Sequence, residues 1–166
     1  MAVVLVLLAV LFTAITVADV RERAVYVVHL GLLALLRVLA ALGALAASVW
    51  HVGASAPWLA LPLSTWGFAP LAWQALAGVG VALLLWLMGA AVSKATAAPS
   101  VGRGDVLLIA ACCMFLRLDL LEPYLLLVAL AGVAMALFWR FARKSSTFPF
   151  APALVWPCWA VLLACQ

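Results

Sequence analysis

Charged side chains are scarce in this chain. Asp, Glu, Lys and Arg make up 8% of its 166 residues, nine basic and five acidic side chains in all. Soluble domains carry about 25% charged residues, because their surfaces have to face water. Hydrophobic residues reach 71%, and the mean hydropathy is +1.35. The composition therefore excludes a soluble domain of any size and indicates an integral membrane protein.

Side chains that bind metals are also few, namely two histidines and four cysteines. The cysteines are Cys112, Cys113, Cys158 and Cys165. All four lie in apolar segments, without a Cys-x-x-Cys pair and without a histidine at ligand spacing. This pattern argues against a zinc site and a disulfide framework. We expect buried, inert thiols and neither a metal nor another cofactor.

Long apolar runs are abundant, and several approach the roughly 20 residues that cross a hydrocarbon layer about 30 Å thick. The predicted spans cover residues 2–18, 24–48, 70–92, 105–116, 124–139 and 148–165. No internal repeat or linker divides them. We therefore expect an all-α, polytopic membrane protein of about six transmembrane helices, forming one domain over residues 1–166.

Two segments need separate interpretation. The first run has no basic residue before Asp19, unlike a signal peptide, so we expect a retained helix. Residues 49–69 are uncharged and contain Trp50, Trp58 and Trp66 among prolines. This composition predicts an interfacial loop with the indoles at headgroup level.

The basic residues predict the orientation. If the amino terminus lies outside the cytoplasm, the loops after the first, third and fifth spans face the cytoplasm. These loops hold Arg21, Arg23, Lys94, Arg103, Arg140, Arg143 and Lys144, whereas the opposite loops hold Arg117 alone. This is a strong positive-inside bias. The net charge of +4 is thus explained by orientation, and no nucleic-acid partner is expected.

Two acidic residues fall at the same predicted depth. Asp19 lies at the cytoplasmic end of the first span, and Asp105 begins the fourth. If these two helices pack together, the carboxyl groups can face each other. Two close carboxyl groups in a poorly solvated site share one proton, so one can activate a water molecule while the other acts as an acid. The pair predicts an aspartyl protease site.

Simpler roles remain open for the polar residues. Asp19 could pair with Arg23 one turn later, and Asp105 could cap its helix. Arg37, within the second span, should face the bundle interior or water. His29 could line a cavity or be packed.

Two further predictions concern the cytoplasmic ends of the helices. Ser93 and Lys94 are adjacent, which is a poor arrangement for a catalytic dyad. Glu22 is a candidate for attracting a basic substrate segment.

Three segments resemble the prepilin peptidase (type IV leader peptidase) family. Residues 102–105 read Gly-Arg-Gly-Asp, similar to the Gly-x-Gly-Asp signature of intramembrane aspartyl proteases. Residues 18–21, Ala-Asp-Val-Arg, resemble the Asp-x-Arg segment of that family. Residues 148–154, Phe-Pro-Phe-Ala-Pro-Ala-Leu, resemble its late Ile-Pro-Phe-Gly-Pro-Phe-Leu segment. The three segments occur in the order of the family.

The resemblance implies a six-helix peptidase that cleaves the basic leader from prepilins or pseudopilins at the cytoplasmic face of the inner membrane. It implies that Asp19 and Asp105 are catalytic. Gly102 and Gly104 would let the backbone approach the substrate, and Pro149 and Pro152 would shape the start of the last helix. The chain resembles the short, peptidase-only members, without an N-methyltransferase domain.

The chain also departs from the family pattern. Val25-Tyr26-Val27 stands where Ile-Pro-Asn is usual, and Leu107 stands where Lys is frequent. Ala151 and Ala153 replace Gly and Phe of the late segment. An inactive member, or a non-enzymatic membrane component such as an assembly factor or small transporter subunit, is the alternative. The oligomeric state is not predicted.

Overall fold

The computed structural model describes residues 2–50, 66–96, 102–143 and 148–165, and these are helical almost throughout. The elements are α1 (Ala2–Glu22), α2 (Val27–Trp50), α4 (Phe68–Thr96), α5 (Arg103–Cys113), the short 3-10 helix η2 (Leu118–Leu120), α6 (Leu121–Arg143) and α7 (Ala151–Ala164). The described part of the chain contains no strand. The prediction of an all-α protein with about six helices is confirmed.

Four of the helices have the length and apolar composition needed to cross a membrane. They are Ala2–Glu22, Val27–Ala47, Phe68–Ala95 and Leu118–Ala142. In lipid a helix satisfies its own backbone hydrogen bonds, which explains why these apolar runs are helical. Helices α5 and α7, with 11 and 14 residues, are shorter. At 1.5 Å per residue they extend only about 16 and 21 Å.

Several helix ends differ from the predicted spans. Helix α1 continues through Glu22, four residues beyond the apolar run, so Asp19 lies inside its last turns. Helix α5 ends at Cys113 rather than near residue 116. Helix α6 begins at Leu121, so Glu122 and Pro123 belong to its first turn and not to the predicted loop. A polar residue can continue a helix where its backbone stays hydrogen-bonded, and apolarity alone does not reveal this.

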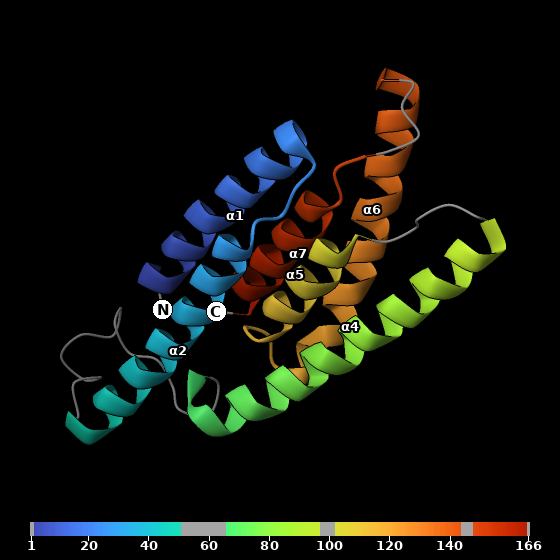
Figure 1. The fold of residues 1–166 in the computed structure, drawn as a ribbon. Helices are drawn as coiled ribbons and strands as arrows, with labels where there is room; N and C mark the ends of the chain where they lie inside the picture. Colours follow the sequence, from blue (N-terminus) through green and yellow to red (C-terminus); the bar gives the residue numbers. More distant parts are fainter. Residues whose placement is uncertain (1, 51–65, 97–101, 144–147, 166) are drawn as a thin grey trace.

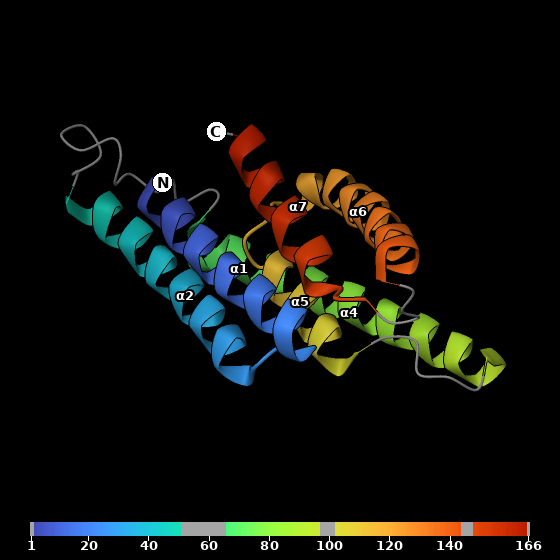
Figure 2. The same cartoon turned by 90° about the horizontal axis from the view of Figure 1, so that it is seen from above.

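Helix α7 lies between α1 and α6, as Figures 1 and 2 show, and packs against α1, α5 and α6. Helix α5 also packs against α4 and α2. The buried stripe of α1 follows a spacing of four and three residues, through Leu8, Phe12 and Ile15, and the next position is Asp19. Asp19 is therefore buried because it lies on the face that α1 presents to the bundle.

Helices α4 and α5 approach each other closely at Gly78. A Cβ atom at this position would lie 2.8 Å from the backbone oxygen of Ala110 and 3.2 Å from the Cβ of Cys113. Small residues let membrane helices come close enough for extensive van der Waals contact. The absence of a side chain at Gly78 therefore sets the distance between α4 and α5.

Arg37 is fully buried in the middle of the bundle, and its guanidinium joins several elements. It donates hydrogen bonds to the backbone oxygen of Met114 (2.7 Å), the backbone oxygen of Trp66 (2.7 Å) and Oε1 of Gln74 (2.8 Å). It also lies 5.3 Å from the ring centroid of Trp66. The prediction that Arg37 faces the bundle interior agrees with this position. These oxygen acceptors, one in α4, one just before α4 and one just after α5, compensate the free-energy cost of burying the charge.

Two details of the predicted packing are wrong. Trp66 is 1% exposed and stacks edge-on against Phe115 at 6.3 Å, so it belongs to the core and not to an interfacial belt. Its indole is held by Arg37 and Phe115, which the sequence pattern did not reveal. Cys165 is exposed after the end of α7, unlike the buried Cys112, Cys113 and Cys158, and all four thiols are free. Trp58 lies outside the described residues, and the side chain of Trp50 does too.

We predict that Arg37→Met lowers the free energy of unfolding by about 2–4 kcal/mol, because several buried oxygen acceptors lose their donor. Thermal unfolding in detergent, followed by tryptophan fluorescence, measures this change. Arg117→Met is the matched control, since Arg117 is exposed and pairs with exposed Asp119. An equal effect of both substitutions would show that the buried hydrogen bonds of Arg37 contribute little.

Candidate active site

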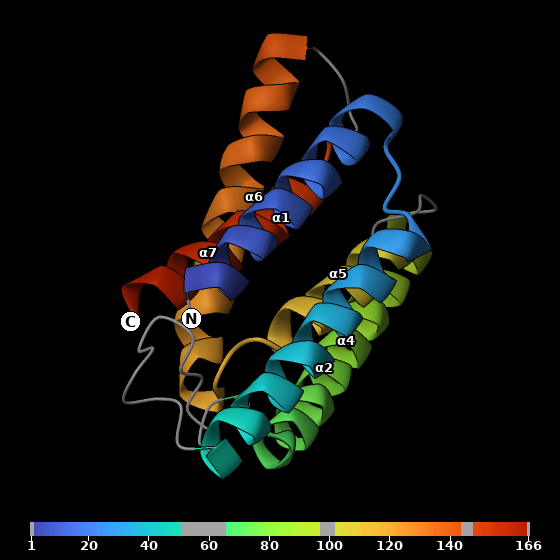
Figure 3. The same cartoon turned by 90° about the vertical axis from the view of Figure 1, so that its left-hand side faces the viewer.

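The two predicted catalytic acids lie at the same end of the bundle. Figures 1 and 3 show that α1 ends, and that α5 and α7 begin, at the end opposite the two chain termini. Asp19 belongs to the last turns of α1 and Asp105 to the first turn of α5. The alternating directions of the helices therefore bring together residues that are 86 positions apart in the sequence.

Asp19 is 6% exposed and is bonded to the start of α7. One carboxylate oxygen, Oδ2, accepts a hydrogen bond of 2.9 Å from the backbone N–H of Ala151. Ala151 is the first residue of α7, and this N–H has no acceptor within its own helix. A carboxylate at a helix amino terminus is also favoured by the helix dipole. Asp19 thus caps α7 from another helix.

Asp105 is partly buried and occupies the third position of α5, where Gly102 is the N-cap. Its carboxylate accepts a hydrogen bond from the backbone N–H of Gly102. An acidic residue at this position that reaches back to the N-cap is half of a capping box. The simpler prediction that Asp105 caps its helix therefore describes a real contact, although the N-cap residue itself is Gly102.

The carboxyl groups of Asp19 and Asp105 lie within electrostatic range of each other. The helices that carry them do not meet in the expected way, since the main partners of α1 are α7 and α2, whereas those of α5 are α4, α7 and α2. Helix α7 packs against both. The beginning of α7 thus positions Asp19, and the packing of α7 on α5 connects Asp19 to the helix that carries Asp105.

The signature glycines have close neighbours within the chain. A Cβ at Gly102 would lie 2.8 Å from Oδ2 of Asp105, and a Cβ at Gly104 would lie 3.1 Å from the Cβ of Val25. Gly102 therefore leaves room for the Asp105 carboxylate. Gly104 leaves room for the link between α1 and α2. The two prolines lie at the start of α7, where Pro149 is buried and Pro152 is the second helical residue.

The link between α1 and α2 is short. Arg23 follows α1 with a left-handed backbone (φ 54°), and its N–H donates to the backbone oxygen of Asp19 at 3.0 Å. Its guanidinium lies 5.4 Å from the ring centroid of Trp139 in α6. The side chain of Arg23 is thus directed at α6 and lies within electrostatic range of Asp19.

The remaining candidates lie around this end without completing a second site. Glu22 is exposed and accepts a hydrogen bond from the hydroxyl of Tyr26. His29 is partly buried and packs edge-on against Tyr26, with ring centroids 5.7 Å apart. Ser93 and Lys94 belong to the last turns of α4, and Lys94 is exposed. No group of three or more His, Cys, Asp or Glu side chains able to hold a metal occurs among the described residues.

The sequence pattern did not reveal the contact of Asp19 with the backbone N–H of Ala151. The late proline-containing segment pointed to the start of α7, but a backbone donor leaves no trace in a side-chain pattern. It also missed Trp139, the aromatic partner of Arg23. The site therefore contains groups that only the three-dimensional arrangement reveals.

The fold and the site define a polytopic helical membrane protein with two acids at one end of the bundle. The chain is 34% identical over 98 residues to a prepilin leader peptidase/N-methyltransferase from Neisseria gonorrhoeae. The match covers 59% of this chain and 34% of that protein, so the chain matches about a third of the length of this relative. No family model matches, and no solved structure matches. The similarity supports a relationship to the prepilin peptidase family.

We predict that Asp19→Ala lowers the free energy of unfolding by about 0.5–2 kcal/mol, the usual effect of losing a helix cap. Asp19→Asn should lower it less, because an amide oxygen can still accept the N–H of Ala151. Thermal or denaturant unfolding in detergent measures both changes. Asp119→Ala, at an exposed position, should change stability little. Equal stability of Asp19→Ala and the wild type would contradict the capping role.

Proposed function

We propose that this chain is an intramembrane aspartyl endopeptidase. Its substrate would be a prepilin or pseudopilin, whose basic leader it removes at the cytoplasmic face of the inner membrane. One observation carries the proposal: two acids from distant parts of the sequence lie within electrostatic range at one end of a membrane bundle. The 98-residue similarity to a prepilin leader peptidase supports the substrate class.

The proposed reaction needs one proton shared by the pair. The ionised carboxyl group takes a proton from a water molecule, whose oxygen attacks the carbonyl carbon of the scissile peptide bond. The protonated carboxyl group donates a hydrogen bond to the carbonyl oxygen. It then helps to protonate the leaving nitrogen as the C–N bond breaks. The water is consumed, two peptide fragments leave, and neither a covalent intermediate nor a metal takes part.

The surroundings of each acid suit this chemistry. Ala151 N–H holds the Asp19 carboxylate, and Gly102 N–H holds that of Asp105. Fixed donors at two helix amino termini preorganise the negative charge in a site where Asp19 is buried and Asp105 is partly buried. Burial strengthens these interactions, since the effective dielectric constant is lower than in water.

Basic residues at the end of the bundle that holds both acids predict the orientation of the protein in the membrane. Helices α1, α4 and α6 end there, and these ends carry Arg21, Lys94 and Arg140. Under the positive-inside rule this end faces the cytoplasm. The proposed site would therefore open toward the compartment in which a prepilin leader resides.

We predict that Asp19→Asn and Asp105→Asn each reduce cleavage about 10²–10⁴-fold, the usual contribution of an acid or base. The assay uses detergent-solubilised protein with pilin precursors from the same genome, and mass spectrometry of the mature amino terminus. Asp119→Asn should cleave normally, and EDTA should have no effect. Full activity of either variant would end the catalytic role of that residue.

The Asp19 variants also separate catalysis from structure. If Asp19 serves only as a cap in a non-enzymatic membrane component, Asp19→Asn keeps the function of the protein and Asp19→Ala lowers only its stability. Complete loss of cleavage on chelation would indicate a metalloprotease instead.

We predict that Gly102→Ala reduces kcat about 10–100-fold and lowers the free energy of unfolding by no more than the loss of a helix cap, about 0.5–2 kcal/mol. The new Cβ would overlap Oδ2 of Asp105, a flexible side-chain atom, so the carboxylate moves and the fold is kept. A displacement of about 1 Å can cost about 100-fold in rate. Gly80→Ala is the matched control, since nothing lies within 4 Å of its Cβ position. Similar kinetics of both variants would argue against a precise placement of Asp105.

A further inference from the structure

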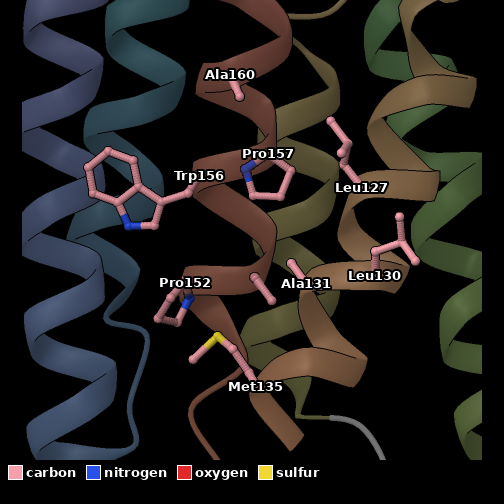
Figure 4. Close-up of a pocket in the computed structure, with 9 residues that line it drawn as sticks. Leu127, Leu130, Ala131, Met135, Pro152, Trp156, Pro157 and Ala160 are labelled. Carbon is pink, nitrogen blue, oxygen red and sulfur yellow. The ribbon is translucent and has the colours of Figure 1, made fainter. Parts of the chain in front are cut away.

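An apolar groove runs along α7 beside α6 (Figure 4). Its volume is about 470 Å³. Helix α7 contributes Pro152, Ala153, Trp156, Pro157 and Ala160, and α6 contributes Leu127, Leu130, Ala131 and Met135. None of the described residues that line it is charged. The neighbouring surface of α6 exposes Leu126, Val133 and Phe138, as expected where a helix faces lipid.

Trp156 bounds the groove on the side of α1. In Figure 4 its ring points away from α6 and toward α1, and its indole N–H donates a hydrogen bond of 3.2 Å to the hydroxyl of Thr16. The groove therefore covers one face of α7 and is bounded by α6 on one side and by the Trp156 ring on the other.

The groove begins next to the proposed catalytic site. Its first lining residue, Pro152, directly follows Ala151, whose N–H holds the Asp19 carboxylate. On another flank of the site, Val25 of the link between α1 and α2 lies against Gly104. Helix α7 therefore begins beside Asp19, and the groove runs along the lipid-facing side of this helix from its beginning.

The shape of the groove suits a helix. Ala153, Pro157 and Ala160 have a spacing of four and three residues, so these small or flat side chains share one face of α7. The lined part of α7, from Pro152 to Ala160, is nine residues long, and its ends lie about 12 Å apart. Ala153 and Pro157 are buried, whereas Ala160 is exposed, and its small side chain lets a second helix approach closely in lipid.

We propose that this groove receives the apolar helical segment that follows the scissile bond of the substrate. This inference rests on the proposed function. A peptide bond at the junction of a basic leader and an apolar segment can reach Asp19 only if the apolar segment lies in lipid beside the acids. The groove starts one residue from Ala151, which contacts Asp19. The end of the apolar segment nearest the scissile bond would therefore lie at the site.

A second groove provides a control of similar size. It has a volume of about 440 Å³ and lies between α1 and α7, lined by Ala2, Leu5, Val6, Ala9, Val10, Thr13, Trp159 and Leu163. This lining comes from the first half of α1 and the end of α7, at the end of the bundle opposite Asp19. A substrate in this groove would not lead to the acids.

The test compares Ala131→Phe, which fills the first groove, with Ala9→Phe, which fills the second. Both alanines are partly buried in their grooves. Two substrates are used: a full-length prepilin and a short peptide that covers the leader junction without the apolar segment. We expect Ala131→Phe to reduce the ratio of kcat/KM for the full-length over the short substrate about tenfold, mainly through KM. Ala9→Phe should leave this ratio unchanged.

A photo-crosslinking amino acid at position 131 gives a second measurement that does not depend on activity. We expect it to crosslink to the apolar segment of a prepilin added to the doubly inactive Asp19→Asn, Asp105→Asn protein. Crosslinks to lipid alone, or an equal loss of both substrates in Ala131→Phe, would overturn the inference. Failure of the wild type to cleave any prepilin would instead refute the proposed function.

Discussion

The hydrogen bond between the Ala151 N–H and the Asp19 carboxylate is the contact on which the arrangement of this site depends. It joins the end of α1 to the beginning of α7 across 132 positions of the chain. A buried carboxylate without donors would be costly in a lipid-embedded bundle, and a helix start without acceptors would be costly too. Each group removes the cost of the other. Because α7 also packs on α5, the same contact links Asp19 to the helix that carries Asp105.

Arg37 fixes the bundle at a different level. Its hydrogen bonds reach Met114 beyond the end of α5 and Trp66 just before α4. These are backbone oxygens that no helix satisfies internally, so a buried cation serves as a shared donor for helix ends. Two buried charged side chains thus stabilise the bundle by binding helix ends. Asp19 binds the beginning of α7, and Arg37 binds a residue just beyond the end of α5. Long apolar surfaces supply contact area, but such contacts have little directional preference in lipid.

Much of the fold and part of the site follow from the sequence. The apolar runs predict the membrane helices, because lipid leaves a long apolar segment few alternatives to a helix. The alternating direction of six helices then places Asp19 and Asp105 at one end. The sequence does not predict that α1 and α5 meet through α7, because a uniformly apolar helix does not show which of its faces is buried. Nor does it predict the burial of Trp66, since an indole suits a core and an interface equally. The contact of Gly104 with Val25 depends on the path of a short link, which periodicity does not describe.

The shortness of α5 and α7 has a consequence for chemistry. A helix that crosses the whole bilayer presents its first N–H groups to headgroups and water, where their partial positive charge is screened. A helix of 11 or 14 residues can begin deeper within the bundle, so its unsatisfied N–H groups point at neighbouring side chains. Both short helices direct such a start at a carboxylate, α5 at Asp105 and α7 at Asp19. Two acids of like charge can then lie within range of each other, since each has its own backbone donor. A helix that crosses the whole bilayer in either place could carry the same residue. The partial positive charge of its first N–H groups would then be screened by water and would act less strongly on the carboxylate.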